Sequence, residues 1–182
     1  MEADLVSHGG DSAAGSFVHT LTLTDVASGW TECVALVVRD GALVTAALEH
    51  LRTAMPFRCA ELRPTMAASS WTRPWPPIAR RMAFRARDRG RTTRTIRRGS
   101  SKRTAPSCGA SSAYRRLERV GGRRRAIAAL YAASRLFVNF FQPSSKLASK
   151  PRVGATVRKA YHAPETPYAR LLDSVAVTDA MK

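Results

Sequence analysis

Cysteines, aromatic side chains and long apolar runs are all scarce in this chain of 182 residues. Its three cysteines, Cys33, Cys59 and Cys108, lie far apart and form no CxxC pair. This excludes a disulfide framework and favours a reducing compartment. No apolar run approaches the roughly 18 residues that span a bilayer. The start, MEADLVSHGG, is acidic and lacks the apolar core of a signal peptide. We therefore expect a cytoplasmic protein without a membrane partner.

Acidic residues are also few, with 13 Asp and Glu against 30 Lys and Arg and a formal net charge of +17. The surplus is local: residues 1–57 carry a net charge of −5, residues 58–125 one of +17 and residues 126–182 one of +5. A basic surplus of this size favours nucleic acid as a partner. Such a change normally marks a domain boundary or a tail, but here it lies inside the chain.

The first 57 residues predict a three-strand meander followed by a helix. Apolar and polar residues alternate in SFVHTLTLTDV, and a turn at residues 27–29 leads to the β-rich run TECVALVV. A short strand at residues 5–6 precedes this hairpin. Apolar residues then recur at helical spacing over residues 42–55. Asp25 opens the turn, where a turn or capping role is expected of it.

The last third predicts one long helix and an extended tail. The helix covers residues 124–141, and Gln142-Pro143-Ser144 ends it. Its spacing favours a buried face over aromatic rings that stack on nucleic-acid bases. This face comprises Ile127, Leu130, Tyr131, Ser134, Phe137, Val138 and Phe141. The proline-marked tail that follows suits a docking segment or linker.

The middle segment, residues 58–110, has neither a two-residue nor a 3.6-residue apolar period. Pro74, Pro76 and Pro77 interrupt any regular element near its start. Taken literally, it is an arginine-rich disordered arm that binds phosphates electrostatically. The chain thus divides into residues 1–57, residues 58–110 and residues 111–182.

The two flanks resemble a known family. MEADLV, TLTLTDVASGWTE and LYAASRLFVNFFQPSSKLA are similar to the integrase-type (DDE) catalytic domain of bacterial insertion-sequence transposases. The resemblance implies an α/β, RNase H-like fold, here partial: a mixed five-strand sheet with helices on both faces. It also implies DNA as partner, Mg²⁺ as cofactor, phosphodiester cleavage and strand transfer as activity, and a homo-oligomer for an intact member.

The family needs three carboxylates to hold two Mg²⁺ ions. They are an Asp on the first strand, an Asp opening a D-N-G-x-E-F motif after the fourth strand, and a Glu on a later helix. Asp4 matches the first, as catalytic and metal-binding residue. In residues 58–110 only Glu61 and Asp88 are acidic, and neither lies in such a motif.

A shift of the reading frame predicts which positions would encode the other two carboxylates. If residues 59–109 are read one base out of the ancestral frame, Met66 (ATG) forces a glycine codon under Ala67. The codons of TMAASSW then permit D-N-G-S-E-F-V, with the Asp under Thr65. The same shift places the family's Glu under Ser101. Out-of-frame GC-rich codons encode Arg, Ala, Pro and Thr, which accounts for the basic composition.

A chain with one of three carboxylates is expected to be inactive. The shift also predicts the loss of the fourth and fifth strands and of the helix that bears the Glu. Two alternatives stay open: a sequence-independent nucleic-acid-binding protein that uses the arginine-rich arm, and a non-functional product. Asp4 and His8, four residues apart, have the spacing of a metal pair, but coincidence is the more frequent explanation.

Overall fold

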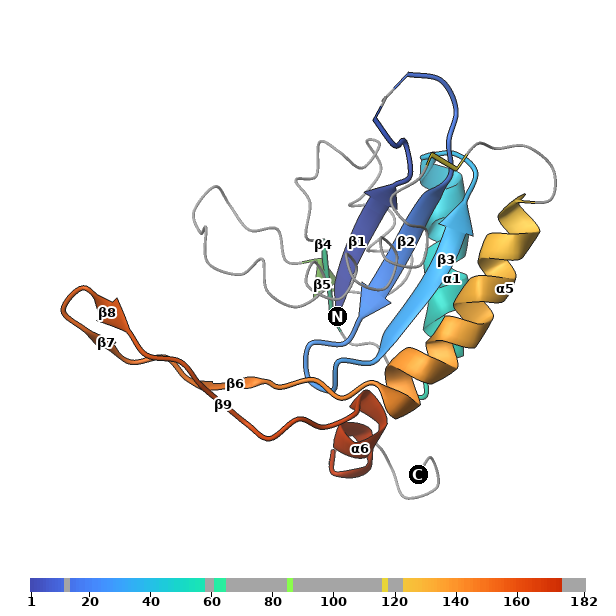
Figure 1. Ribbon diagram of the computed structural model, residues 1–182. Helices are drawn as coiled ribbons and strands as arrows, with labels where there is room; N and C mark the ends of the chain where they lie inside the picture. The colour runs from blue at the N-terminus through green and yellow to red at the C-terminus, as the bar shows by residue number, and fades with distance from the viewer. Residues whose placement is uncertain (12–13, 58–60, 65–84, 87–115, 118–122, 175–182) are drawn as a thin grey trace.

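Five strands form a mixed sheet in the order β3-β2-β1-β4-β5 (Figure 1). The computed structural model describes residues 1–11, 14–57, 61–64, 85–86, 116–117 and 123–174. β1 is the central strand: β2 pairs with it antiparallel and β4 pairs with it parallel. The strands are β1 (Glu2–Ser7), β2 (His19–Thr24), β3 (Thr31–Leu36), β4 (Glu61–Pro64) and β5 (Arg85–Ala86).

The predicted meander is confirmed and its register is continuous. Ala3 lies opposite Leu23 in β2, which in turn lies opposite Glu32 in β3. Asp25 closes the turn between β2 and β3, because its Oδ2 accepts hydrogen bonds from the backbone N–H and the hydroxyl of Ser28, both at 2.7 Å. The expected turn role of Asp25 is therefore confirmed.

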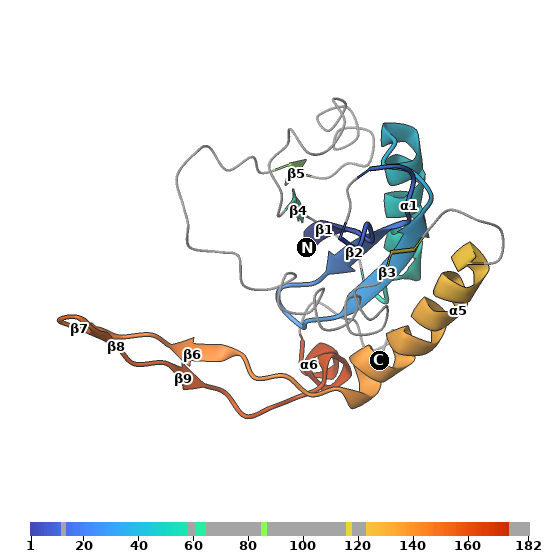
Figure 2. The same cartoon turned by 45° about the horizontal axis from the view of Figure 1, so that its top comes forward.

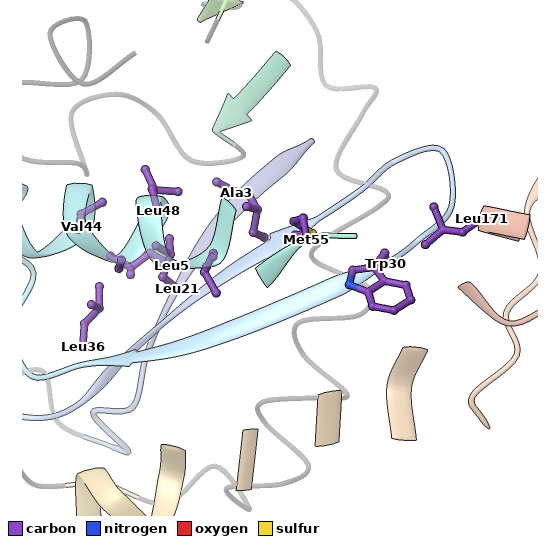
Figure 3. Packing of buried hydrophobic residues seen from close by; sticks show 12 residues of the cluster. Ala3, Leu5, Leu21, Trp30, Leu36, Val44, Leu48, Met55 and Leu171 are labelled. Atoms are coloured by element: carbon purple, nitrogen blue, oxygen red, sulfur yellow. The ribbon is translucent and has the colours of Figure 1, made fainter. Parts of the chain in front are cut away.

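Helix α1 (Gly41–Ala54) covers one face of the sheet, as the apolar spacing predicts. Asp40 caps it, with Oδ1 accepting from the backbone N–H groups of Ala42 and Leu43 at 2.9 and 3.2 Å. Each fully buried leucine stabilises such a core by about 1.5–3 kcal/mol. The cluster in Figure 3 comprises Ala3, Leu5, Leu21, Leu23, Trp30, Leu36, Val44, Ala47, Leu48, Leu51, Met55 and Leu171.

Helix α5 (Arg123–Leu136) packs against β3 on the opposite face (Figures 1 and 2). A second apolar cluster forms there from Val18, Ile127 and Tyr131, with Cys33 and Ala35 partly buried against it. The sheet is thus a middle layer between two helices. No helix among the described residues is long and apolar enough to cross a membrane.

Strands β4 and β5 correct two predictions. The proposed frameshift predicts that the fourth and fifth strands are lost, yet both are present, and both lie in the segment 58–110 for which disorder is predicted. They join the sheet through parallel backbone pairing, such as Ala3 with Pro64 and Leu62 with Ala86. Backbone pairing satisfies the open edge of β1 without requiring a particular side-chain pattern. The rest of that segment lies outside the described residues.

The long helix ends in a π-helical turn, η3 (Phe137–Phe141), which changes the predicted face. Phe137 and Phe141, predicted to be buried, are 59% and 71% exposed. The wider turn rotates the residues after Leu136, so Asn139 points inward in place of the two rings, while Val138 is buried as predicted. Leu130, also predicted to be buried, is 39% exposed. Phe140 packs edge-on against Trp30, with ring centroids 5.5 Å apart.

The predicted extended tail contains further structure. A two-stranded ribbon runs out and back through β6 (Leu147–Ser149), β7 (Arg152–Val153), β8 (Thr156–Val157) and β9 (Ala160–Tyr161). Helix α6 (Pro167–Leu172) follows it and buries Leu171 in the main core. The tail therefore returns to the domain, which local sequence patterns did not indicate.

Asn139 joins η3 to the start of β3. Its side chain is fully buried, and it both accepts from the backbone N–H and donates to the backbone carbonyl of Thr31, each at 2.8 Å. A buried backbone group left without a partner costs about 1–3 kcal/mol. The two bonds therefore hold the helix end against the edge strand.

We predict that Asn139→Ala lowers the free energy of unfolding by about 2–4 kcal/mol, because both backbone groups of Thr31 lose their partner. Urea unfolding measures this. Phe141→Ala in the same turn is the control and should change stability by less than about 0.5 kcal/mol, since the ring is exposed. Equal losses in the two variants would contradict the role assigned to Asn139.

Candidate functional site

Asp4 lies in the middle of the central strand, with its side chain partly buried. Its register partner on β2 is Thr22, and its Oδ1 accepts a hydrogen bond from the backbone N–H of Leu5 at 3.0 Å. Ala3 and Leu5 belong to the core beside α1. Because side chains alternate along a strand, Asp4 points to the opposite face of the sheet, the one on which α5 packs.

The other two predicted positions, Thr65 and Ser101, lie outside the described residues. The parallel pairing of β1 and β4 nevertheless bears on the first of them. The last residue pair between these two strands is Ala3 with Pro64. Asp4 follows Ala3 in β1, and Thr65 follows Pro64 in the sequence. In sequence, the position that the resemblance implies for the D-N-G-x-E-F motif is therefore the first one after the strand that pairs with β1.

The described residues do not fit a site for two Mg²⁺ ions. They contain no group of three His, Cys, Asp or Glu side chains that could hold a metal. Such a site needs several carboxylates, because Mg²⁺ takes oxygen ligands and binds through carboxylates and substrate phosphates. Among the three carboxylate positions of the family, only Asp4 lies in the part of the chain that the structure describes.

Three threonines line β2 on the face to which Asp4 points: Thr20, Thr22 and Thr24, all buried. Thr20 is the centre of a polar chain, with its Oγ1 2.7 Å from His8 Nε2 and 2.5 Å from the hydroxyl of Tyr131 on α5. Thr24 Oγ1 lies 3.3 Å from Thr31 Oγ1. The His8 ring is thus bonded to Thr20 on the neighbouring strand.

Burial lowers the pKa of two histidines, His8 on this face and His19 on the opposite face of the sheet, to which Leu21 also points. The pKa of His8 lies below 6.5 because the ring is desolvated. The pKa of His19 is also lowered, mainly by burial and further by the charges of Arg39 and His8. His19 Nδ1 lies 3.0 Å from the hydroxyl of Ser7. Both rings are therefore neutral at pH 7 and act as hydrogen-bond partners rather than as cations for phosphate.

Glu32 on the edge strand β3 is buried and makes an ion pair with Arg135, whose side chain is 40% exposed. Its Oε1 accepts from Arg135 Nε at 2.7 Å and from Trp30 Nε1 at 2.8 Å, while Arg135 Nη2 donates to the carbonyl of Ala54 at 2.8 Å. Burial raises the pKa of Glu32, and the bonds to Trp30 and Arg135 oppose this. Arg135 thereby joins α5 to the end of α1 around the sheet edge, which is a structural role.

Sequence reasoning missed these polar contacts. The alternation TLTLT predicts one buried and one polar face, and a polar face on a meander is normally taken as solvated. Helix α5 covers that face in the structure, so the threonines and His8 are buried. The available signal was the second amphipathic helix, because a helix with an apolar face must cover something.

The fold is similar to that of retroviral integrase cores. The catalytic core domain of BIV integrase superposes with a TM-score of 0.58 and 8% identity, over 94% of this chain and 93% of that one. An integrase in a simian T-cell lymphotropic virus intasome, in complex with PP2A regulatory subunit B56 gamma, gives 0.59 and 8%, over 90% and 66%. This chain has the fold of an integrase catalytic core. The expected RNase H-like fold class is thereby confirmed.

The amino-acid sequence is also similar to that of one bacterial protein. Uncharacterized protein y4rM of Sinorhizobium fredii is 38% identical over 179 residues, which cover 93% of this chain and 48% of the relative. The chain therefore spans about half the length of this relative. The part left out is much shorter than residues 58–110, so the aligned region extends across the basic middle segment. No family model matches the chain.

The two histidines predict a pH dependence of stability. Their folded-state pKa values lie below the unfolded value of 6.5, so the folded chain binds fewer protons. This contribution is complete above pH 6.5 and is lost as pH falls through the folded pKa values. We expect urea unfolding to show lower stability at pH 5.5 than at pH 7.5, and His8→Gln to reduce that difference.

His162→Gln is the control, because His162 is exposed on the ribbon. The contribution of Glu32 has the opposite sign, since its pKa is raised, but it is common to all variants and cancels in the comparison. A stability difference between the two pH values that His8→Gln leaves unchanged would refute the assignment.

Proposed function

We propose that this chain derives from the catalytic domain of a transposase that cuts and joins DNA, and that as written it is inactive. The observation that carries this is the position of Asp4 on the central strand of an integrase-like sheet, beside a parallel β4 that ends one residue before position 65. This is where the first two carboxylates of a DDE site belong. The bacterial insertion-sequence origin rests on the sequence resemblance of the flanks.

A frameshift explains why an integrase-like sheet carries an incomplete carboxylate set. The sheet needs only backbone pairing at β4 and β5, whereas catalysis needs specific side chains beyond each of them. Reading residues 59–109 one base out of frame keeps the chain length and removes the Asp and the Glu. The relative from Sinorhizobium fredii supports the inference that the chain length is kept, because the aligned region crosses this segment.

Restoring the frame between codons 59 and 109 is the decisive test. We expect the restored protein to join labelled donor DNA ends to a target duplex with Mg²⁺ or Mn²⁺, and the chain as written to give no product above background. Loss of two of three carboxylates removes most of the electrostatic attraction for the ions. Gel analysis of the joined product measures the activity.

Asp4→Asn in the restored protein is the matched control, since it removes one charge with almost no change of volume. It should abolish joining if Asp4 is a metal-binding residue. Joining activity in the chain as written, or stop codons in the alternative frame of the gene, would overturn the proposal. Activity that survives Asp4→Asn would overturn the site.

The arginine-rich arm is the second candidate, as a sequence-independent nucleic-acid-binding element. Twenty Lys and Arg against three Asp and Glu in residues 58–125 favour it. Its residues lie almost entirely outside the described part of the chain, so it stays a prediction, as does the homo-oligomer expected of an intact family member.

A further inference from the structure

The basic ribbon, residues 143–164, stands apart from the sheet (Figures 1 and 2). Residues 147–165 are all exposed. Val153 and Tyr161 are 73% and 53% exposed, so the ribbon presents apolar surface as well as charge. An isolated two-stranded ribbon is at best marginally stable in water. A partner that covered this surface would therefore stabilise the ribbon.

The charge of the ribbon has one sign. Between Pro143 and Pro164 there is no Asp or Glu, whereas five residues are basic: Lys146, Lys150, Arg152, Arg158 and Lys159. The side chains of Lys150, Arg158 and Lys159 make no ion pair with a carboxylate of the described residues. Their charges are thus available to an external polyanion, and residues 1–57, with a net charge of −5, do not share this character.

The base of the ribbon is held firmly by the domain. Backbone bonds join Ser144 to Glu165, the acidic residue that directly follows the ribbon. Arg170 of α6 donates to the Ser144 hydroxyl and to the Ser28 carbonyl, each at 3.1 Å, and also to the Ser144 carbonyl. Lys146 Nζ donates to the Val26 carbonyl at 3.0 Å. The turn between β2 and β3 therefore anchors the ribbon.

The dimensions of the ribbon suit a duplex. Its tip is a two-residue turn with Gly154 at φ +58°. Ten residues from Ser144 to this tip reach about 30 Å at the rise per residue of a strand. That is close to one helical turn of DNA, and the major groove admits a two-stranded β-ribbon. Lysines and arginines on such a ribbon neutralise phosphates along the strand.

We propose that the basic ribbon is a duplex-DNA contact surface, separate from the Asp4 site. The inference rests on the proposed function only for the choice of DNA as the polyanion. The anchored base gives the ribbon a defined direction, and the exposed charges near its tip contact backbone phosphates without reading the sequence.

The test compares two double variants of the full chain in equilibrium binding to a short DNA duplex, without divalent metal. Arg158→Ala/Lys159→Ala removes two ribbon charges, and Arg39→Ala/Arg52→Ala removes two exposed charges elsewhere. Each lost phosphate contact lowers the slope of log K against log salt by about 1. We expect the ribbon variant to lower the slope by about 2 and the control to leave it unchanged.

Arg158→Lys/Lys159→Arg keeps both charges and should restore the slope of the original chain. Equal slopes in the ribbon and control variants would overturn the ribbon proposal while leaving the proposed function standing. If the ribbon variant lowered the salt slope of binding to single-stranded RNA of the same length by the same amount, the assignment to duplex DNA would be overturned. Conversely, a lowered slope together with an inactive frame-restored protein would refute the proposed function alone.

Discussion

Backbone pairing of β1 with strands on both sides is the constraint on which the rest of the molecule depends. The antiparallel register with β2 decides which side chains face α1 and which face the opposite layer. The parallel register with β4 decides what lies beside Asp4. A slip of one residue would exchange the two faces, moving Ala3 and Leu5 out of the core and Asp4 into it.

The two faces are stabilised differently. Beside α1 the contacts are apolar, as expected for the main core. Beside α5 the sheet presents threonines, and the polar groups there are satisfied by one another through Thr20, His8 and Tyr131. Asn139 and the Arg135–Glu32 pair hold the same helix to the edge strand. A buried polar layer of this kind holds only with every partner in place, because an unpaired buried group is costly.

The chain carries basic residues in two separate places, the middle segment and the ribbon. The large basic surplus lies in residues 58–125, where the proposed frameshift would account for it through codon composition alone. The ribbon has a smaller surplus, but it is structured, anchored by Arg170 and free of acidic residues. For DNA contact, position counts for more than the total, because Coulomb attraction beyond about 10 Å is screened at physiological salt.

The sequence by itself determined the meander, helix α1, the extent of the long helix and the role of Asp25, because local periodicity and turn chemistry decide these. It also singled out Asp4 through a family resemblance. Only the tertiary structure decided that Phe137 and Phe141 are exposed, since a π-helical turn breaks the 3.6-residue period that predicted their burial. It likewise decided that β4 and β5 complete the sheet. β4 pairs with the open edge of β1, a strand about 60 residues away, and β5 pairs with β4. Local sequence does not encode contacts between separate segments of this kind.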